Sequence, residues 1–206
     1  GISISVIDGI EEADLIYYGN RMAVKMNESI SLIMDIGGGS TEFILGNEHT
    51  IFWKKSFLLG AARLLEKFKL SDPITFDETV DFNAYLRHEL GPLFEAIKHY
   101  KPAELIGSSG AFDSVVDVIA GEFGTEALND EHTEYNIDLN HYAFISKKIK
   151  ESTIKERYHI TGLIDMRVDM IVISVLLIDF ILKELHLTHM IVISVLLIDF
   201  ILKELH

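Results

Sequence analysis

Three consecutive glycines between two largely apolar runs constrain the fold of this sequence more than any other feature. Residues 35–42 read DIGGGSTE, with residues 30–34 before them and residues 43–45 after them. Short apolar runs that are bounded by turn residues predict buried strands. Glycine loses more backbone freedom on folding than any other residue, so a triple glycine suggests that the backbone approaches a ligand closely. Backbone N–H groups in such a loop form a concave site for an anion.

An acidic residue stands at each end of this glycine loop. Asp35 and Glu42 offer carboxylate oxygens, which Mg²⁺ prefers as ligands, beside the expected phosphate. The residues expected to hold the phosphate are Gly37, Gly38, Gly39 and Ser40. A glycine-rich hairpin turn is the alternative interpretation. The Walker A pattern is excluded, because it requires a lysine after the last glycine and a helix directly afterwards.

A second glycine-containing loop, GSSGA at residues 107–111, joins an expected strand to an expected helix. The N-terminus of a helix at such a turn attracts anions through its free N–H groups and its dipole. This loop therefore adds four candidate phosphate contacts, Gly107, Ser108, Ser109 and Gly110. An ordinary turn, in which Ser109 caps the helix, is the alternative.

The hydrophobic pattern predicts an α/β lobe with a mixed sheet. Expected strands cover residues 2–7, 30–35, 41–46, 50–57 and 104–107. Expected helices cover residues 11–18, 60–69, 76–100, 109–120, 140–150 and 164–185, of which the last is apolar nearly all round and therefore buried. The polar residues 121–138 predict a surface loop. The order βββ-α-α-β-α, followed by C-terminal helices, is that of a ribonuclease-H-like lobe.

The chain ends in an exact internal repeat. Residues 170–186, MIVISVLLIDFILKELH, recur unchanged at 190–206. A solenoid needs at least three repeats, so we interpret the second copy as a sequence-assembly error, with a recent tandem duplication as the alternative. We expect residues 1–169 to form a phosphate-binding lobe and residues 170–206 to form an apolar helical tail. An exposed apolar helix in this tail would favour dimerisation.

Charge and cysteine content exclude several classes of function. The net charge of −14 disfavours nucleic acid or an anionic membrane as a partner of the broad surface. The absence of cysteine excludes disulfides, thiolate zinc sites and a cysteine nucleophile, and fits a reducing cytoplasm. The longest apolar run, residues 170–178, is too short to span a bilayer. Basic residues that could attract a polyanion are local, namely Lys54, Lys55, Arg63, Lys67 and Lys69.

Four segments of the chain together resemble the exopolyphosphatase / guanosine pentaphosphate phosphohydrolase family of the actin-like ATPase superfamily. They are VIDGIEEADLIYYG at 6–19, DIGGGSTE at 35–42, LGAARL at 59–64 and GSSGA at 107–111. The resemblance implies an Mg²⁺-assisted attack of water that releases terminal orthophosphate from polyphosphate or guanosine pentaphosphate, and leaves the choice between these substrates open. Two-lobed members of that family are often homodimers, whereas the sequence itself does not give the oligomeric state.

Members of that family begin with a further lobe, which carries a first phosphate loop of the DxGSNS type. No such motif occurs in this sequence. We therefore expect the chain to resemble the second half of a two-lobed enzyme, and to provide one wall of a cleft between the lobes.

The resemblance also assigns catalytic roles to three acids. Glu12 matches the catalytic base of the family, whereas the residues alone favour a first-turn carboxylate that stabilises a helix. Asp35 and Glu42 match ligands of metal or water. Arg167 and Asp169 match an RxD segment of the family and are expected to form a structural ion pair.

Two other classes of function remain open at this point. A non-catalytic fragment would bind phosphate without turnover, because the first lobe is missing. An actin-like kinase would transfer phosphate to an acceptor, although the EEA segment at 11–13 counts against this.

Overall fold

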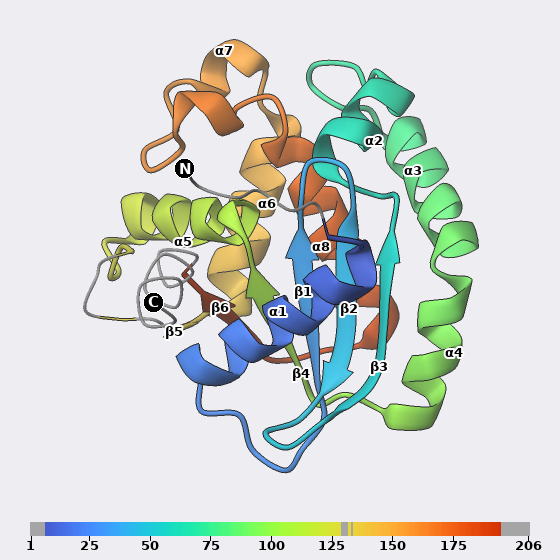
Figure 1. Cartoon of the computed structure of the whole chain (residues 1–206). Coiled ribbons are helices and arrows are strands. Elements are labelled where there is room, and N and C mark those ends of the chain that lie inside the picture. Colours follow the sequence, from blue (N-terminus) through green and yellow to red (C-terminus); the bar gives the residue numbers. More distant parts are fainter. Residues whose placement is uncertain (1–6, 129–131, 133, 195–206) are drawn as a thin grey trace, which may run out of the picture.

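A six-stranded mixed sheet forms the centre of the molecule (Figure 1), in a computed structural model that describes residues 7–128, 132 and 134–194. The strands lie in the order β3-β2-β1-β4-β6-β5. Their bounds are β1 Ser31–Ile36, β2 Thr41–Gly46, β3 Ile51–Phe57, β4 Glu104–Ser108, β5 Glu134–Asn136 and β6 Met190–Ile193. Strands β1, β2 and β3 form an antiparallel meander, β1, β4 and β6 run parallel, and β5 is antiparallel to β6. This mixed sheet confirms the predicted fold class.

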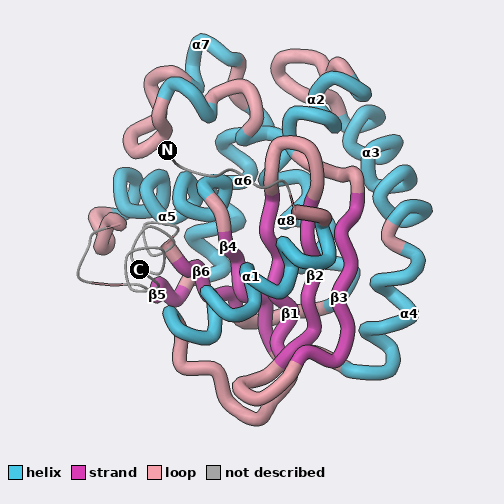
Figure 2. The backbone as a smooth tube through the Cα atoms, in the orientation of Figure 1, coloured by secondary structure: helices cyan, strands magenta, loops and turns pink. Residues whose placement is uncertain are grey.

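Helices cover both faces of the sheet, but very unequally. Helix α1 (Gly9–Ala23) crosses one face in front of β1, β2 and β3, as Figures 1 and 2 show. The other helices are α2 Ala61–Phe68, α3 Phe76–Glu89, α4 Gly91–Tyr100, α5 Gly110–Phe123, α6 Leu139–Glu151, the single turn α7 Ile154–Arg157, the 3₁₀ turn η1 Asp165–Arg167 and α8 Ile171–Leu185. None of the helices in the described part of the chain has both the length and the apolar character to cross a bilayer.

Burial on both faces explains why the central strands read as continuous apolar runs. In β1, Leu32 and Met34 belong to the large cluster that also contains the side chains of α5 and α8. Ile33 points the other way and packs with Ala13 and Tyr17 of α1. Because successive side chains of a strand alternate between faces, Asp35 lies on the same face as Ile33, under α1.

Three expected helices have different bounds in the structure. The helix expected at 164–185 begins only at Ile171, as α8, and the separate turn η1 precedes it. Residues 76–100 form α3 and α4 instead of one helix, with the break at Leu90. Pro92 lies in the first turn of α4, where its missing N–H costs no hydrogen bond. Helix α1 does not stop at Gly19 but continues to Ala23.

The C-terminal tail is only partly helical, which corrects the expectation for residues 190–193. Residues 171–173 begin α8, whereas the identical residues 191–193 lie in β6, between β4 and β5. Isoleucine and valine favour strands wherever neighbouring strands bury them and bond their backbone, and β4 and β5 provide that context. The adjacent β5 also lies within the segment expected to be a loop. Residues 195–206 of the second copy, and nearly all of the strand expected at 2–7, lie outside the described residues.

Candidate functional site

A row of four polar side chains crosses four neighbouring strands next to the glycine loop. Ser56 of β3 pairs in register with Glu42 of β2, Glu42 pairs with Asp35 of β1, and Asp35 pairs with Ser108 of β4. Residues that are paired across strands point to the same face and lie side by side. The row therefore faces α1, with its two carboxylates in the middle and a serine at each end.

The two carboxylates of this row lie side by side, with Glu42 buried and Asp35 half-buried. Glu42 is only 1% exposed. Burial raises the pKa of Asp35 to about 6, a hydrogen bond from Ser108 opposes the rise, and the nearby carboxylates of Glu42, Glu12 and Asp113 add to it. Like charges directly opposite each other destabilise a sheet, so the pair favours a bound cation or a proton.

Glu12 approaches the same pair from the first turn of α1. The helix begins after Asp8, whose Oδ1 accepts hydrogen bonds from the N–H groups of Ile10 and Glu11, each at 2.9 Å. Burial raises the pKa of Glu12, and the negative charge of Glu42 adds to this effect. The structure thus brings Glu12, Asp35 and Glu42 together at one place.

The glycine loop between β1 and β2 is bound to the start of α2. The N–H groups of Ala61 and Ala62 donate to the carbonyls of Gly37 and Gly38, at 2.9 and 3.1 Å. A Cβ on Gly60 would overlap the backbone of Gly38, so only glycine allows this close approach. A Cβ on Gly39 would meet no atom within 4 Å, so open space lies beside the loop for a ligand.

Ser109 links the second predicted loop, at 107–111, to the end of β1 beside the glycine loop by hydrogen bonds. Its Oγ donates to the carbonyl of Ile36 at 3.1 Å and accepts from the N–H of Ile36 at 3.3 Å. Ser109 precedes α5 but its side chain makes no capping bond, which corrects the expected N-cap. Its φ of +94° is rare for a residue other than glycine, so the backbone is strained here. The hydroxyl of Ser109 thus joins the two loops.

Two arginines bring positive charge to these loops. The Nε of Arg63 donates to the carbonyl of Gly39 at 2.9 Å. The guanidinium of Arg167 lies so close to Gly110 that a Cβ there would overlap it. Arg167 also lines a cavity of about 50 Å³ together with Gly37 and Gly38. The ion pairs found among the described residues do not include the one expected between Arg167 and Asp169.

Three of the four lysines named as candidates for attracting a polyanion make other contacts. Lys54 pairs with Asp14 of α1. The Nζ of Lys55 lies 5.1 Å from the centre of the Phe57 ring, and that of Lys67 lies 4.6 Å from the centre of the Tyr85 ring. Of the five candidate cations, Arg63 is therefore the one that contacts the glycine loop through a hydrogen bond.

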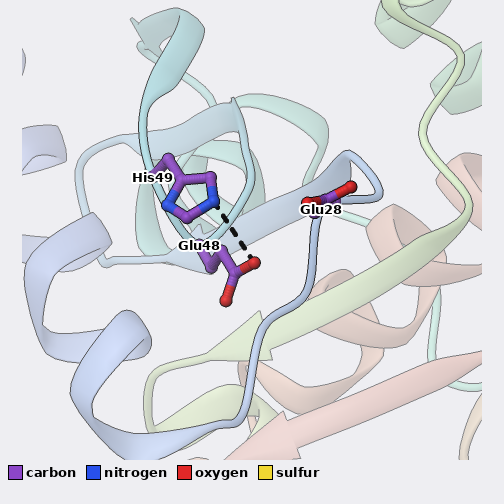
Figure 3. Close-up of side chains that lie close together, drawn as sticks. All are labelled: Glu28, Glu48 and His49. Carbon is purple, nitrogen blue, oxygen red and sulfur yellow. Dashed lines mark ion pairs between the residues drawn. The ribbon is translucent and has the colours of Figure 1, made fainter.

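A separate group of ionisable side chains lies at the opposite end of β1 and β2. Glu28, Glu48 and His49 have ligand atoms within 4.8 Å of one another, as Figure 3 shows. The imidazole Nε2 of His49 already pairs with Glu48 at 3.3 Å. Glu28 and His49 are exposed, and the hairpin that carries Glu48 and His49 is far along the strands from the glycine loop. This group therefore takes no part in the phosphate site.

The sequence offered no local signal for some of these partners. Ser56 lies in an alternating strand, and its hydrogen bond to Glu42 depends on the register between β2 and β3. The place of Arg167 depends on the η1 turn, which folds it back onto the N-terminus of α5.

Comparison with known proteins gives one family for nearly the whole chain. Residues 1–198 match the Ppx/GppA phosphatase family. The chain is 30% identical over 115 residues to exopolyphosphatase 2 of Mycobacterium tuberculosis, covering 56% of this chain and 36% of that protein. It is 25% identical over 135 residues to a guanosine-5'-triphosphate,3'-diphosphate pyrophosphatase of Pseudoalteromonas atlantica, covering 66% of this chain and 26% of that protein. The chain thus spans between about a quarter and just over a third of the length of these curated relatives.

Solved structures give the same result for the fold. An exopolyphosphatase from Cytophaga hutchinsonii superposes with a TM-score of 0.89 and 40% identity, covering 94% of this chain and 62% of that one. A Ppx/GppA family member from Aquifex aeolicus gives a TM-score of 0.78 with 24% identity, covering 100% of this chain and 66% of that one. The fold of the chain is accordingly the actin-like ATPase fold that the resemblance implied.

Proposed function

This chain belongs to the Ppx/GppA phosphatase family, and on that premise we propose that it carries the phosphate-binding wall of a phosphohydrolase. The substrate is inorganic polyphosphate or guanosine pentaphosphate, from which the enzyme releases terminal orthophosphate. The convergence of Glu12, Asp35 and Glu42 beside the glycine loop supports this proposal most directly.

The loops supply the binding of the terminal phosphoryl group. In this proposal its oxygens lie in the open space beside Gly39, where they meet backbone N–H groups. The guanidinium groups of Arg63 and Arg167, next to Gly39 and Gly110, offset part of its negative charge. These local cations compensate for the overall charge of −14, which repels a polyanion at long range.

The donor set of the site fits Mg²⁺. Asp35 and Glu42 place carboxylate oxygens side by side on adjacent strands, and a hard cation relieves the repulsion between them. We propose these two residues as its ligands. When bound, Mg²⁺ neutralises charge on the phosphoryl oxygens.

Glu12 is the proposed general base. The oxygen of a water molecule attacks the terminal phosphorus, Glu12 accepts a proton from that water, and the bridging P–O bond breaks with its electron pair on the shortened chain. The raised pKa of Glu12 suits this role, because a base works best when its pKa lies near the working pH. The absence of cysteine fits a reducing compartment, so we place the reaction in the cytoplasm.

Phosphate release with and without the base tests this proposal. In an enzyme that contains both lobes, with Mg²⁺ present, Glu12→Gln should lower the release of orthophosphate by at least about two orders of magnitude and leave binding largely intact. Release within threefold of the wild type would remove Glu12 from the mechanism. Labelling of an acceptor by ATP would instead identify a kinase, and phosphate binding without turnover at any Mg²⁺ concentration would identify a non-catalytic protein.

A further inference from the structure

The carboxylate of Glu42 has its hydrogen-bond donor on the neighbouring strand. The Oγ of Ser56 in β3 donates to Oε1 of Glu42 in β2 at 2.6 Å, and the two residues pair directly in register. Hydrogen bonds to a buried carboxylate are strong and directional, and Glu42 is only 1% exposed. This bond therefore fixes the direction in which the Glu42 carboxylate points.

The same serine also supports the beginning of α1. A Cβ built on Gly9 would lie 2.6 Å from Cβ and 2.7 Å from Oγ of Ser56, which is closer than packed atoms allow. Gly9, the first residue of α1, thus packs directly against Ser56. A residue with a Cβ would not fit at this position. Glu12 lies three residues later, about one helical turn along α1.

A second contact fixes α1 on β3 in the same region. Lys54 lies two residues before Ser56 and therefore on the same face of β3. Its Nζ donates to the carbonyl of Ile10 at 3.2 Å and pairs with the carboxylate of Asp14. Strand β3 thus contacts both the first and the second turn of α1, on either side of Glu12.

We propose that Ser56 is a positioning residue, which sets the place of the Glu42 carboxylate relative to that of Glu12. The hydroxyl of Ser56 orients the Glu42 carboxylate by a hydrogen bond. The contact between Ser56 and Gly9 sets the distance between the start of α1 and the sheet. The catalytic meaning of this role rests on the proposed function, since it assumes that Glu12 and Glu42 act on the same substrate. The effect of Ser56 on the separation between the Glu12 and Glu42 carboxyl groups does not depend on that assumption.

Two substitutions separate the two contacts of Ser56. Ser56→Ala removes the hydrogen bond to Glu42 but leaves a small side chain under Gly9, whereas Gly9→Ala displaces the start of α1 and leaves the hydroxyl in place. Ser31→Ala is a matched control. The Oγ of Ser31 donates to Oε1 of Glu104 on the adjacent strand at 2.7 Å, in a directly paired position at the other end of the sheet.

Kinetics of phosphate release, with Mg²⁺ and polyphosphate, test the catalytic role. Misplacing a reacting group by about 1 Å costs up to about a hundredfold, so Ser56→Ala and Gly9→Ala should each lower kcat about tenfold to a hundredfold and change KM little. Ser31→Ala should stay within twofold of the wild type in both constants, even where its melting temperature falls as far as that of Ser56→Ala. A kcat of Ser56→Ala that equals that of Ser31→Ala would overturn the proposal and leave Ser56 a purely structural residue.

Crystal structures of the same variants decide the geometric part without any activity. The separation between the Glu12 and Glu42 carboxyl groups should change in Ser56→Ala and in Gly9→Ala, and should match the wild type in Ser31→Ala. An unchanged separation in both site variants would overturn the positioning role. If the wild type released no phosphate but the separations changed as expected, the proposed function would fail while the positioning role of Ser56 stood.

Discussion

Asp35 and Glu42 lie directly opposite each other on β1 and β2, on the sheet face that α1 covers. A sheet gains nothing from two adjacent carboxylates, and their charges repel one another. Their neighbours in the row, Ser108 and Ser56, are hydroxyl donors that orient them without neutralising them. Groups whose arrangement costs stability are expected where function requires them.

We first predict that removal of the Asp35 charge stabilises the protein in a pH-dependent manner. The pKa of Asp35 is about 6 in the folded state, against 3.8 as its ordinary value. The folded protein therefore binds more protons between these values, and its stability falls as pH rises from about 4 through 6. Asp35→Asn should raise the free energy of unfolding by roughly 1–3 kcal/mol at pH 8, and by much less at pH 4, where Asp35 is itself neutral.

Urea unfolding of Asp35→Asn and the wild type, at pH 4 and pH 8 in the presence of EDTA, measures this difference. A gain that is equal at both pH values, or a loss at pH 8, would contradict the repulsion inferred at this site.

The second prediction concerns the metal. If Asp35 and Glu42 bind Mg²⁺, the folded state is stabilised by mass action, by roughly 1.4 kcal/mol when the free ion is at ten times its Kd. This corresponds to a rise of a few degrees in melting temperature for a chain of this length. Glu42→Gln should abolish the rise. Glu28→Gln, in the exposed group of Figure 3, should leave it unchanged, and the opposite pattern would move the cation to that group.

The third prediction tests the close approach between the glycine loop and α2. A Cβ on Gly60 would overlap backbone atoms of Gly38 and Gly39, which cannot rotate away as a side chain could. Gly60→Ala should therefore destabilise the protein by roughly 1–3 kcal/mol and weaken the binding of inorganic phosphate. Gly91→Ala is the control, because a Cβ there meets nothing within 4 Å and alanine favours the helix.

Thermal unfolding and a phosphate titration of both glycine variants give the readouts. Equal stability and equal phosphate affinity for Gly60→Ala and Gly91→Ala would show that the loop tolerates displacement, against the contact inferred between Gly60 and Gly38.

Individual residues show which parts of the fold and of the site can be predicted from the sequence alone. The DIGGGSTE segment predicts the loop and its acids, because the strands on either side and the loop are all local in sequence. The approach of Glu12 could be inferred only through the family resemblance, since it depends on Gly9 resting on Ser56, some 47 residues away. Gly91 and Pro92 indicate the break at Leu90, whereas the apolar period of the helix continues across it without interruption.

The repeated tail shows that the local sequence alone cannot predict the secondary structure of this segment. The same residues, IVI, begin α8 at position 171 and lie in β6 at position 191. In the first case they pack into the large core as part of a helix, and in the second they pair with β4 and β5. Tertiary context decides between the two structures, because the intrinsic preferences of the residues are identical.

The last prediction concerns the strained residue that joins the two loops. Ser109 has a φ of +94°, which glycine adopts readily and alanine does not. Both Ser109→Gly and Ser109→Ala remove the hydroxyl that bridges the backbone of Ile36, but only the alanine keeps the strain. We expect Ser109→Ala to be less stable than Ser109→Gly by about 1 kcal/mol, measured by urea unfolding under identical conditions. An alanine variant as stable as the glycine variant would mean that this turn is relaxed in solution. Both variants should also weaken phosphate binding relative to the wild type, because without the bridge the loop at 107–110 is no longer held against the end of β1.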